Sequence, residues 1–111
     1  MLSTVKAGKL TIRGVSLGGV YTSLFVPELD ALFDLGIPAR SAAGANFLFL
    51  SHGHVDHLGA ICSHLGIRAL TGRHTPPTLF LPAEIVVDVE DVLRAMTRIQ
   101  RYDLKVKAVP M

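Results

Sequence analysis

The stretch SHGHVDHLG, residues 51–59, places three of the chain's five histidines and an aspartate within a few positions of each other. Histidine is the commonest metal ligand in proteins, and carboxylate oxygens complete mixed nitrogen and oxygen sites. In an extended segment the side chains of His52, His54 and Asp56 point to one side, so these three residues can converge. His57 joins them only if the chain turns, which the two glycines of the stretch permit. The stretch therefore predicts a metal site with two neighbouring ligand sets, as a two-metal hydrolase needs.

Two apolar runs lead up to this loop and suggest where it lies in the fold. The run NFLFL at 46–50 is too apolar for a strand with one wet face, so we expect a central strand there. The loop then begins at the carboxyl end of that strand, where sites lie in layered α/β folds. The earlier run ALFDLG at 31–36 predicts a second buried strand. Its Asp34 either marks the strand end, where aspartate favours turns, or supports the metal site.

The rest of the chain alternates strand and helix patterns. We expect strands at 9–13, 20–26, 31–36, 46–50, 78–81 and 104–109, and helices over 58–70 and 89–100. A turn at 17–19 joins the first two strands into a hairpin. This order predicts an α/β domain with a mixed sheet and helices on one face.

Three features of the helical patterns carry further predictions. Asp88 is expected to cap the last helix. His64 follows His57 by seven residues, and we expect it to face solvent or cap the helix rather than bind metal. The side chains of Arg94, Arg98 and Arg101 recur on one helical face. That face is either simply solvated or a stripe that contacts phosphates, and the sequence leaves both interpretations open.

Composition limits the class of protein. Half of the 111 residues are hydrophobic before the ten glycines are counted, against roughly 45–50% with glycine included in ordinary domains. The surplus indicates either an oligomer or a fragment whose apolar sheet face lacks its covering chain, and we favour the fragment. No stretch approaches the length of about 18 apolar residues that spans a bilayer. A single cysteine, Cys62, and the absence of a signal-peptide pattern predict a cytoplasmic protein.

The sequence resembles a known family at these same positions. The hexapeptide HGHVDH at 52–57 matches the H-x-H-x-D-H signature of the metallo-β-lactamase superfamily, and FDLG at 33–36 is similar to its first motif. Within that superfamily the flanking residues, together with PPTLFLPA at 76–83, resemble ribonuclease Z. The resemblance covers nearly the whole chain. It implies the N-terminal half of an αββα sandwich, with residues 1–111 forming a single, incomplete domain.

The resemblance also implies roles for individual residues. His52 and His54 would bind one zinc ion, and Asp56 and His57 the other, with two zinc ions in a complete site. Asp56 would also accept the proton of the attacking water, and Asp34 would support the ligands from behind. These roles imply a zinc-dependent endoribonuclease that hydrolyses a phosphodiester at the 3′ end of precursor tRNA. A homodimer is the assembly that the family implies.

Two observations limit this expectation. The family's later histidine motifs and its bridging aspartate have no counterpart among the 111 residues, so we expect a truncated or fragmentary enzyme that is inactive alone. The loop chemistry is also shared by other metallo-β-lactamase-fold hydrolases that act on small esters. A non-catalytic half-domain is the remaining alternative.

Overall fold

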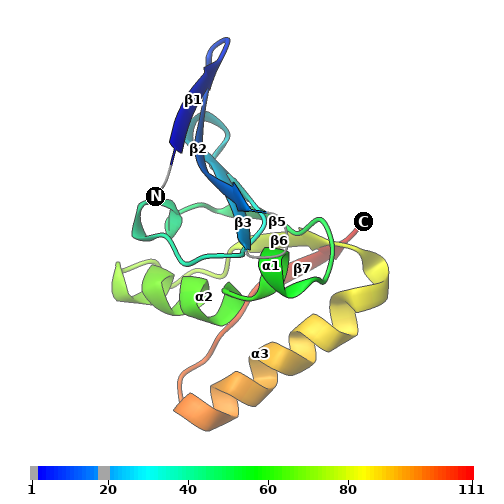
Figure 1. The fold of residues 1–111 in the computed structure, drawn as a ribbon. Coiled ribbons are helices and arrows are strands. Elements are labelled where there is room, and N and C mark those ends of the chain that lie inside the picture. Colours follow the sequence, from blue (N-terminus) through cyan, green and yellow to red (C-terminus); the bar gives the residue numbers. More distant parts are fainter. Residues whose placement is uncertain (1–2, 18–20) are drawn as a thin grey trace.

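The computed structural model describes residues 3–17 and 21–111, and its strands form one mixed sheet in sequence order. Figure 1 shows the arrangement. The seven strands are β1 (Ser3–Ala7), β2 (Leu10–Leu17), β3 (Tyr21–Val26), β4 (Ala31–Phe33), β5 (Phe47–Phe49), β6 (Thr78–Leu81) and β7 (Lys107–Pro110). Strands β1 to β4 pair antiparallel, whereas β4 to β7 pair parallel. The predicted mixed α/β sheet is confirmed, with β5 in its parallel centre.

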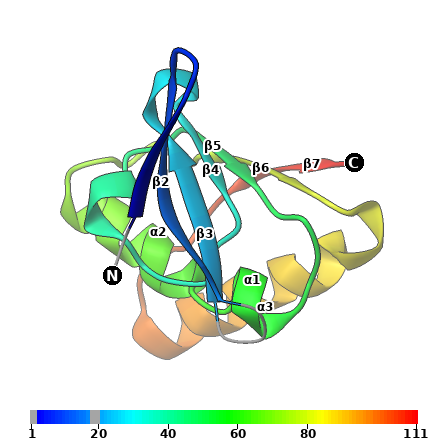
Figure 2. The ribbon, with the colours of Figure 1, turned by 45° about the horizontal axis from the view of Figure 1, so that its top comes forward.

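The helices connect the parallel strands and lie together on one side of them. They are α1 (Val55–Leu58), α2 (Ile61–Leu70) and α3 (Val86–Gln100). Three short 3₁₀ turns, η1 (Pro27–Leu29), η2 (Arg40–Ala42) and η3 (Ala83–Ile85), lie in the other connections or directly before α3. The connections β5–α2–β6 and β6–α3–β7 step across the sheet in the same direction. Because such crossovers are right-handed, both helices fall on the same face, as Figures 1 and 2 show.

The core lies between that face and the two helices. Leu48, Leu79 and Leu81 are fully buried and point toward the helices, where Ile61 and Leu93 meet them. Strand alternation turns the intervening side chains to the other face. There Phe33, Phe49 and Phe80 occupy matched register positions and stack in a row, with ring centroids 5.0 and 4.7 Å apart. These three rings are only partly buried, because α2 and α3 cover the opposite face.

Several expected element boundaries need correction. Strand β4 ends at Phe33 rather than at residue 36, because Asp34 takes a left-handed backbone conformation with φ of 67°. Strand β7 begins at Lys107 rather than at 104, because its pairing starts where β6 starts. Strand β1 was not predicted. All five of its residues are exposed in the structure. A strand that buries neither face has no need of the apolar–polar alternation by which strands are recognised in a sequence. The turn predicted at 17–19 falls largely outside the described residues.

The last helix also begins earlier than predicted. Helix α3 starts at Val86 instead of 89, and its N-cap is Ile85, without a side-chain hydrogen bond. Asp88 therefore lies inside the first turn, and the predicted cap is wrong. No glycine or proline interrupts residues 83–100, so the helical path starts as soon as Pro82 ends β6.

Candidate metal centre

Parallel pairing of β4 with β5 brings Asp34 beside the histidine loop. Phe33 lies opposite Phe49 in the register, and Asp34 N–H donates to the Phe49 carbonyl at 2.7 Å. The two strands therefore end together, and Asp34 faces Ser51. The Ser51 N–H donates to Asp34 Oδ1 at 2.8 Å, and the Ser51 hydroxyl lies 2.9 Å from Oδ2. Asp34 is almost fully buried. The same residue therefore makes both the left-handed turn that ends β4 and the contacts with Ser51.

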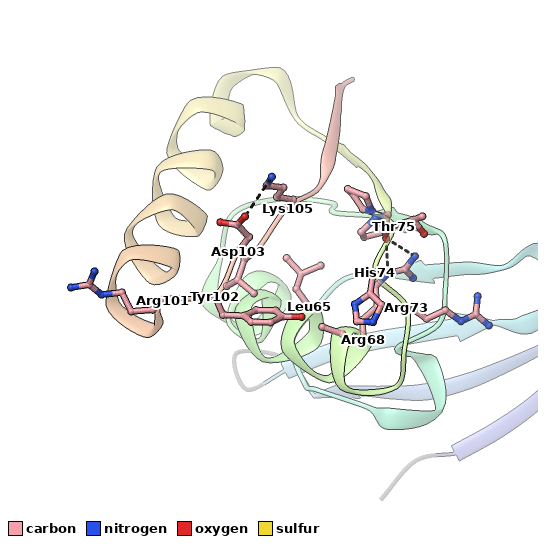
Figure 3. Close-up of a pocket in the computed structure, with 13 residues that line it drawn as sticks. Leu65, Arg68, Arg73, His74, Thr75, Arg101, Tyr102, Asp103 and Lys105 are labelled. Atoms are coloured by element: carbon pink, nitrogen blue, oxygen red, sulfur yellow. Dashed lines mark hydrogen bonds and ion pairs between the residues drawn. The ribbon is translucent and has the colours of Figure 1, made fainter.

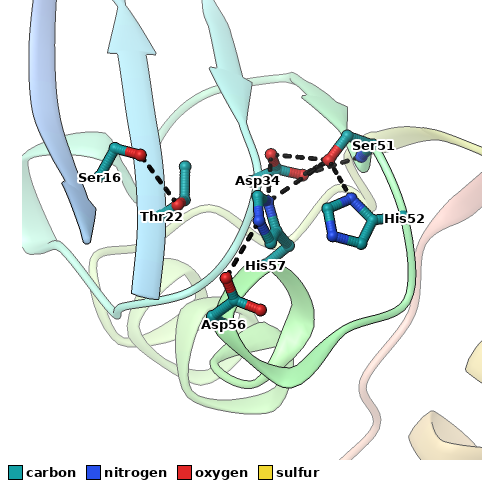
Figure 4. Close-up of polar contacts among 7 residues, drawn as sticks. All are labelled: Ser16, Thr22, Asp34, Ser51, His52, Asp56 and His57. Carbon is teal, nitrogen blue, oxygen red and sulfur yellow. Dashed lines mark hydrogen bonds and ion pairs between the residues drawn. The ribbon is translucent and has the colours of Figure 1, made fainter. Parts of the chain in front are cut away.

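The short helix α1 returns His57 to the same place. His54 is its N-cap, and the His54 carbonyl accepts the His57 N–H at 2.9 Å. A backbone bond from Leu35 N–H to the His57 carbonyl, 2.6 Å long, holds the helix against the end of β4. The His57 ring then reaches Asp34, with Nδ1 2.8 Å from Oδ2. Figure 4 shows Asp34, Ser51, His52, His57 and Asp56 converging at this point.

The candidate ligands form one cluster. Single ligand atoms of His52, His54 and Asp56 all lie within 4.8 Å of one another. The His57 ring centroid lies 3.9 Å from that of His52, and His57 Nε2 lies 3.2 Å from Asp56 Oδ2. His52 and His54 come from an extended loop, as expected, but Asp56 and His57 come from α1. Convergence of Asp56 thus depends on a helical turn and not on the alternation of an extended chain.

Hydrogen bonds indicate which ring nitrogen His57 and His52 present to the cluster. A carboxylate only accepts, so the His57 Nδ1–H donates to Asp34 and leaves the lone pair on Nε2. The Ser51 hydroxyl also donates to Asp34, so its oxygen accepts from His52 Nδ1, 2.9 Å away. His52 therefore presents Nε2 as well. Second partners of this kind set the tautomer of metal-binding histidines.

The donor set fits a cation. His57 Nε2 lies 3.2 Å from Asp56 Oδ2, so a ring nitrogen and a carboxylate oxygen, two kinds of atom that bind zinc, stand side by side. Ligands of a tetrahedral zinc, bound at about 2.0–2.2 Å, lie roughly 3.3–3.6 Å apart. The observed separations bracket that range, from 3.2 Å between His57 Nε2 and Asp56 Oδ2 to at most 4.8 Å among His52, His54 and Asp56. His52 and Asp56 are partly buried and His54 is exposed, so solvent and substrate have access.

Sequence reasoning missed Ser51. Its hydroxyl joins Asp34 to His52. Its position directly after an apolar strand and before the first histidine is the sequence feature that could have indicated this role. Sequence reasoning was wrong about His64, which is fully buried in α2 instead of solvent-facing or capping. Neither of its ring nitrogens has a hydrogen-bond partner among the described residues. Burial, and secondly the charge of Arg68, lower the pKa of His64 to about 4.

The sheet order, the one-sided helices and the loop at the carboxyl end of β5 define a partial α/β metallo-β-lactamase fold. The chain is 35% identical over 107 residues to a protein of Arabidopsis thaliana named tRNase Z TRZ2, chloroplastic. It is 40% identical over 88 residues to the nuclear ribonuclease Z of Triticum aestivum, and 35% over 94 residues to tRNase Z TRZ1 of Arabidopsis thaliana. These matches cover 96%, 77% and 85% of this chain. Over most of its length the chain is thus similar to ribonuclease Z, of which it matches the N-terminal part. No family model matches it.

The matches cover less of the relatives than of this chain. The chain spans 30%, 49% and 33% of their lengths, at most about half. Within residues 3–17 and 21–111 no helix is long and apolar enough to cross a bilayer. Two of the relatives carry the words chloroplastic and nuclear in their names, and the cytoplasmic location stays a prediction.

Proposed function

We propose that this chain carries the first metal-ligand cluster of a zinc-dependent ribonuclease Z, which hydrolyses a phosphodiester at the 3′ end of precursor tRNA. The observation that supports this most is the cluster itself, in which His52, His54, Asp56 and His57 meet beside a buried carboxylate. The name tRNase Z, carried by two of the relatives, supplies the substrate class, tRNA.

Each residue of the cluster has a distinct task in this proposal. His52 and His54 hold one zinc ion, and Asp56 and His57 hold the other. When bound, zinc lowers the pKa of a water to about 7 and polarises the phosphodiester. Asp56 accepts the proton of the attacking water at its carboxylate. Asp34 keeps the proton on His57 Nδ1 and thereby keeps Nε2 available.

The cluster alone falls short of a complete two-zinc centre. A catalytic zinc takes about three protein ligands, so two zinc ions need roughly six ligand contacts, whereas the loop offers four residues. We therefore propose that the 111-residue chain binds zinc weakly and does not cleave by itself. Because it spans at most about half of the relatives' length, the remaining ligands are assigned to chain that these relatives have in addition.

Zinc titration combined with a cleavage assay tests this proposal. Isothermal titration of the metal-free chain with zinc is expected to show weak binding, which His54→Ala and Asp56→Asn reduce about tenfold or more. Asp88→Asn is the matched control, because Asp88 is an exposed carboxylate on α3. Two tightly held zinc ions with cleavage of a precursor tRNA would overturn the requirement for further ligands. Zinc binding that is unaffected by His54→Ala would overturn the site.

A further inference from the structure

A hollow of the molecule lies away from the histidine cluster. It has a volume of about 510 Å³ and is formed by the end of α2, the loop 71–77 and the segment 101–105, as Figure 3 shows. Pro77 and Lys105 lie just before β6 and β7, so the hollow sits at the amino ends of the parallel strands. The histidine cluster follows the carboxyl end of β5. The two places are therefore at opposite ends of the sheet, and we call the second one the α2–β7 pocket.

The α2–β7 pocket concentrates positive charge. Its lining contains the cationic residues Arg68, Arg73 and Lys105 and one carboxylate, Asp103, which gives a net formal charge of +2 without Arg101, whose guanidinium points outward. This equals the net charge of the whole chain. Asp103 Oδ2 lies 3.5 Å from Lys105 Nζ, and both side chains are about two-thirds exposed, so this pair is weak in water. The pocket thus attracts anions more strongly than the average surface of this chain.

Arg68 supplies charge without a carboxylate partner. It is 2% exposed, and its five N–H groups donate to the carbonyls of Thr75, Ala43 and Ala45 and to the amide oxygen of Asn46. These acceptors are all neutral, so no carboxylate bonds directly to Arg68 among the described residues. Burial and then the charge of Arg73 lower the pKa of Arg68, and the charge of Asp30 raises it by less. An anion bound beside Arg68 and Arg73 adds an opposing charge to this pair.

An aromatic ring projects into the same pocket. Tyr102 is about half exposed, and Figure 3 shows its ring extending from the 101–105 segment toward His74. The left-handed conformation of Arg101 ends α3 and directs the next residue inward, while the Arg101 guanidinium points outward. Gln100 Nε2 donates to the Tyr102 carbonyl at 3.1 Å and fixes this turn. Nucleic-acid bases stack on exposed rings in positively charged grooves of this kind.

A smaller hollow of about 270 Å³ adjoins the α2–β7 pocket. The two share Pro76, Leu104 and Lys105, and the smaller one adds the cations Arg94 and Lys107 and the carboxylate Glu90. Arg94 is paired with Asp91, so Lys107 contributes the more available charge. The adjoining hollows thus place Lys105 and Lys107 two residues apart on one segment, which matches the successive phosphates of an extended strand better than one isolated anion.

We propose that the α2–β7 pocket binds a nucleotide of a single-stranded RNA segment, with its base against Tyr102 and its phosphates toward Lys105. The choice of RNA as the polymer rests on the proposed function, whereas the anionic and ring-bearing character of the ligand rests on the pocket alone. The site lies apart from the metal cluster, so it positions RNA without taking part in cleavage.

Binding of a fluorescent eight-nucleotide RNA, followed by anisotropy in the presence of a chelator, tests this inference independently of zinc and cleavage. Tyr102→Ala and Lys105→Ala are each expected to weaken binding about tenfold, because stacking and phosphate contacts contribute on that scale. Asp103→Asn removes the one carboxylate and is expected to strengthen binding, a gain that misfolding cannot produce. Lys9→Ala is the matched control, since Lys9 is exposed at the far β1–β2 turn.

Salt dependence and a competitor complete the experiment. The slope of log affinity against log salt is expected to change by about 0.7 in Lys105→Ala, which corresponds to one phosphate contact on a single strand. Adenosine monophosphate is expected to compete only at far higher concentration than unlabelled RNA. Equal competition by the mononucleotide would overturn the strand assignment. Equal binding by wild type, Tyr102→Ala and Lys105→Ala, or no binding at all, would overturn the site.

Discussion

Asp34 connects the fold to the candidate metal centre. It ends β4 in a left-handed turn, accepts the Ser51 N–H and hydroxyl, and accepts the His57 Nδ1–H. One buried carboxylate thereby sets the presented nitrogen of two histidines, directly for His57 and through Ser51 for His52. Partners of this kind orient a metal site without touching the metal.

Replacement of Asp34 by asparagine is therefore expected to weaken zinc binding by about 10- to 100-fold, with Ser51→Ala producing a smaller loss. An amide in place of the carboxylate no longer requires the proton on His57 Nδ1. Isothermal titration with zinc measures the loss, and circular dichroism checks that the fold is kept. Ser63→Ala, an exposed serine on α2, is the control. An unchanged affinity in Asp34→Asn would show that the carboxylate has no supporting role.

His64 makes stability depend on pH. Its pKa is lowered from 6.5 to about 4 by burial and then by Arg68, so the unfolded chain binds the proton more readily than the folded chain. The contribution of neutral His64 to the unfolding free energy is fully present above pH 6.5. It is lost as pH falls toward 4, by roughly 3 kcal/mol in total. His64→Leu is expected to remove this dependence, because it replaces a ring with two unpaired nitrogens by an apolar side chain.

Urea denaturation of both proteins between pH 7 and 4 measures the difference. As pH falls, the unfolding free energy of wild type is expected to decrease more steeply than that of His64→Leu. Carboxylates titrate in both proteins over this pH range, so the difference between the two curves reports His64 alone. His74→Asn, in an exposed loop, is expected to follow wild type. Parallel curves for wild type and His64→Leu would contradict a neutral, buried His64.

Among the elements, α1 has its position set by close backbone contacts with the ends of β3 and β4. Gly36 N–H donates to the Thr22 carbonyl at 2.8 Å, and Ala60 N–H donates to the Leu35 carbonyl at 2.7 Å. A methyl group on Gly36 would lie 2.1 Å from the Asp56 carbonyl and 2.4 Å from the Thr22 nitrogen. Because both neighbours are backbone atoms, room for the methyl group requires a shift of α1 or of β3.

Gly36→Ala is accordingly expected to lower the unfolding free energy by about 1–3 kcal/mol and to weaken zinc binding by shifting Asp56. Gly66→Ala provides the opposite case. Gly66 lies within α2 with nothing near its added methyl group, so the substitution is expected to stabilise by about 0.5–1 kcal/mol. Urea denaturation and zinc titration of both variants test the contrast. A Gly36→Ala variant as stable as wild type would show that α1 is loosely held.

At the scale of the whole molecule, the apolar face of the parallel strands stands out. Phe33, Phe49 and Phe80 lie there in a row, and Phe47, on the same side of β5, is 42% exposed. The helices cover the opposite face. Contiguous apolar surface of this kind favours association with another surface, and it accounts for the apolar surplus in the composition.

The 111-residue chain is therefore expected to self-associate at high concentration, and Phe47→Lys is expected to reduce this. Sedimentation velocity over a range of concentrations measures it. Leu70→Lys is the control, because Leu70 is 89% exposed at the end of α2, away from this face. Equal reductions by both variants would indicate a general charge effect. The family's homodimer stays a prediction, which this experiment addresses only for the chain alone.

Local sequence patterns determined where the buried strands lie and which residues cluster in the loop after β5. The apolar runs at 31–36 and 46–50 predicted the buried strands, and the loop at 51–59 predicted the clustered ligands, because alternation and turn chemistry act over a few residues. The tertiary structure alone decided which distant residues meet. Asp34 reaches Ser51 and His57 across 17 and 23 positions, and His64 is buried by packing its helix against the sheet. Strand order and register bring these residues together, and no short-range pattern encodes either.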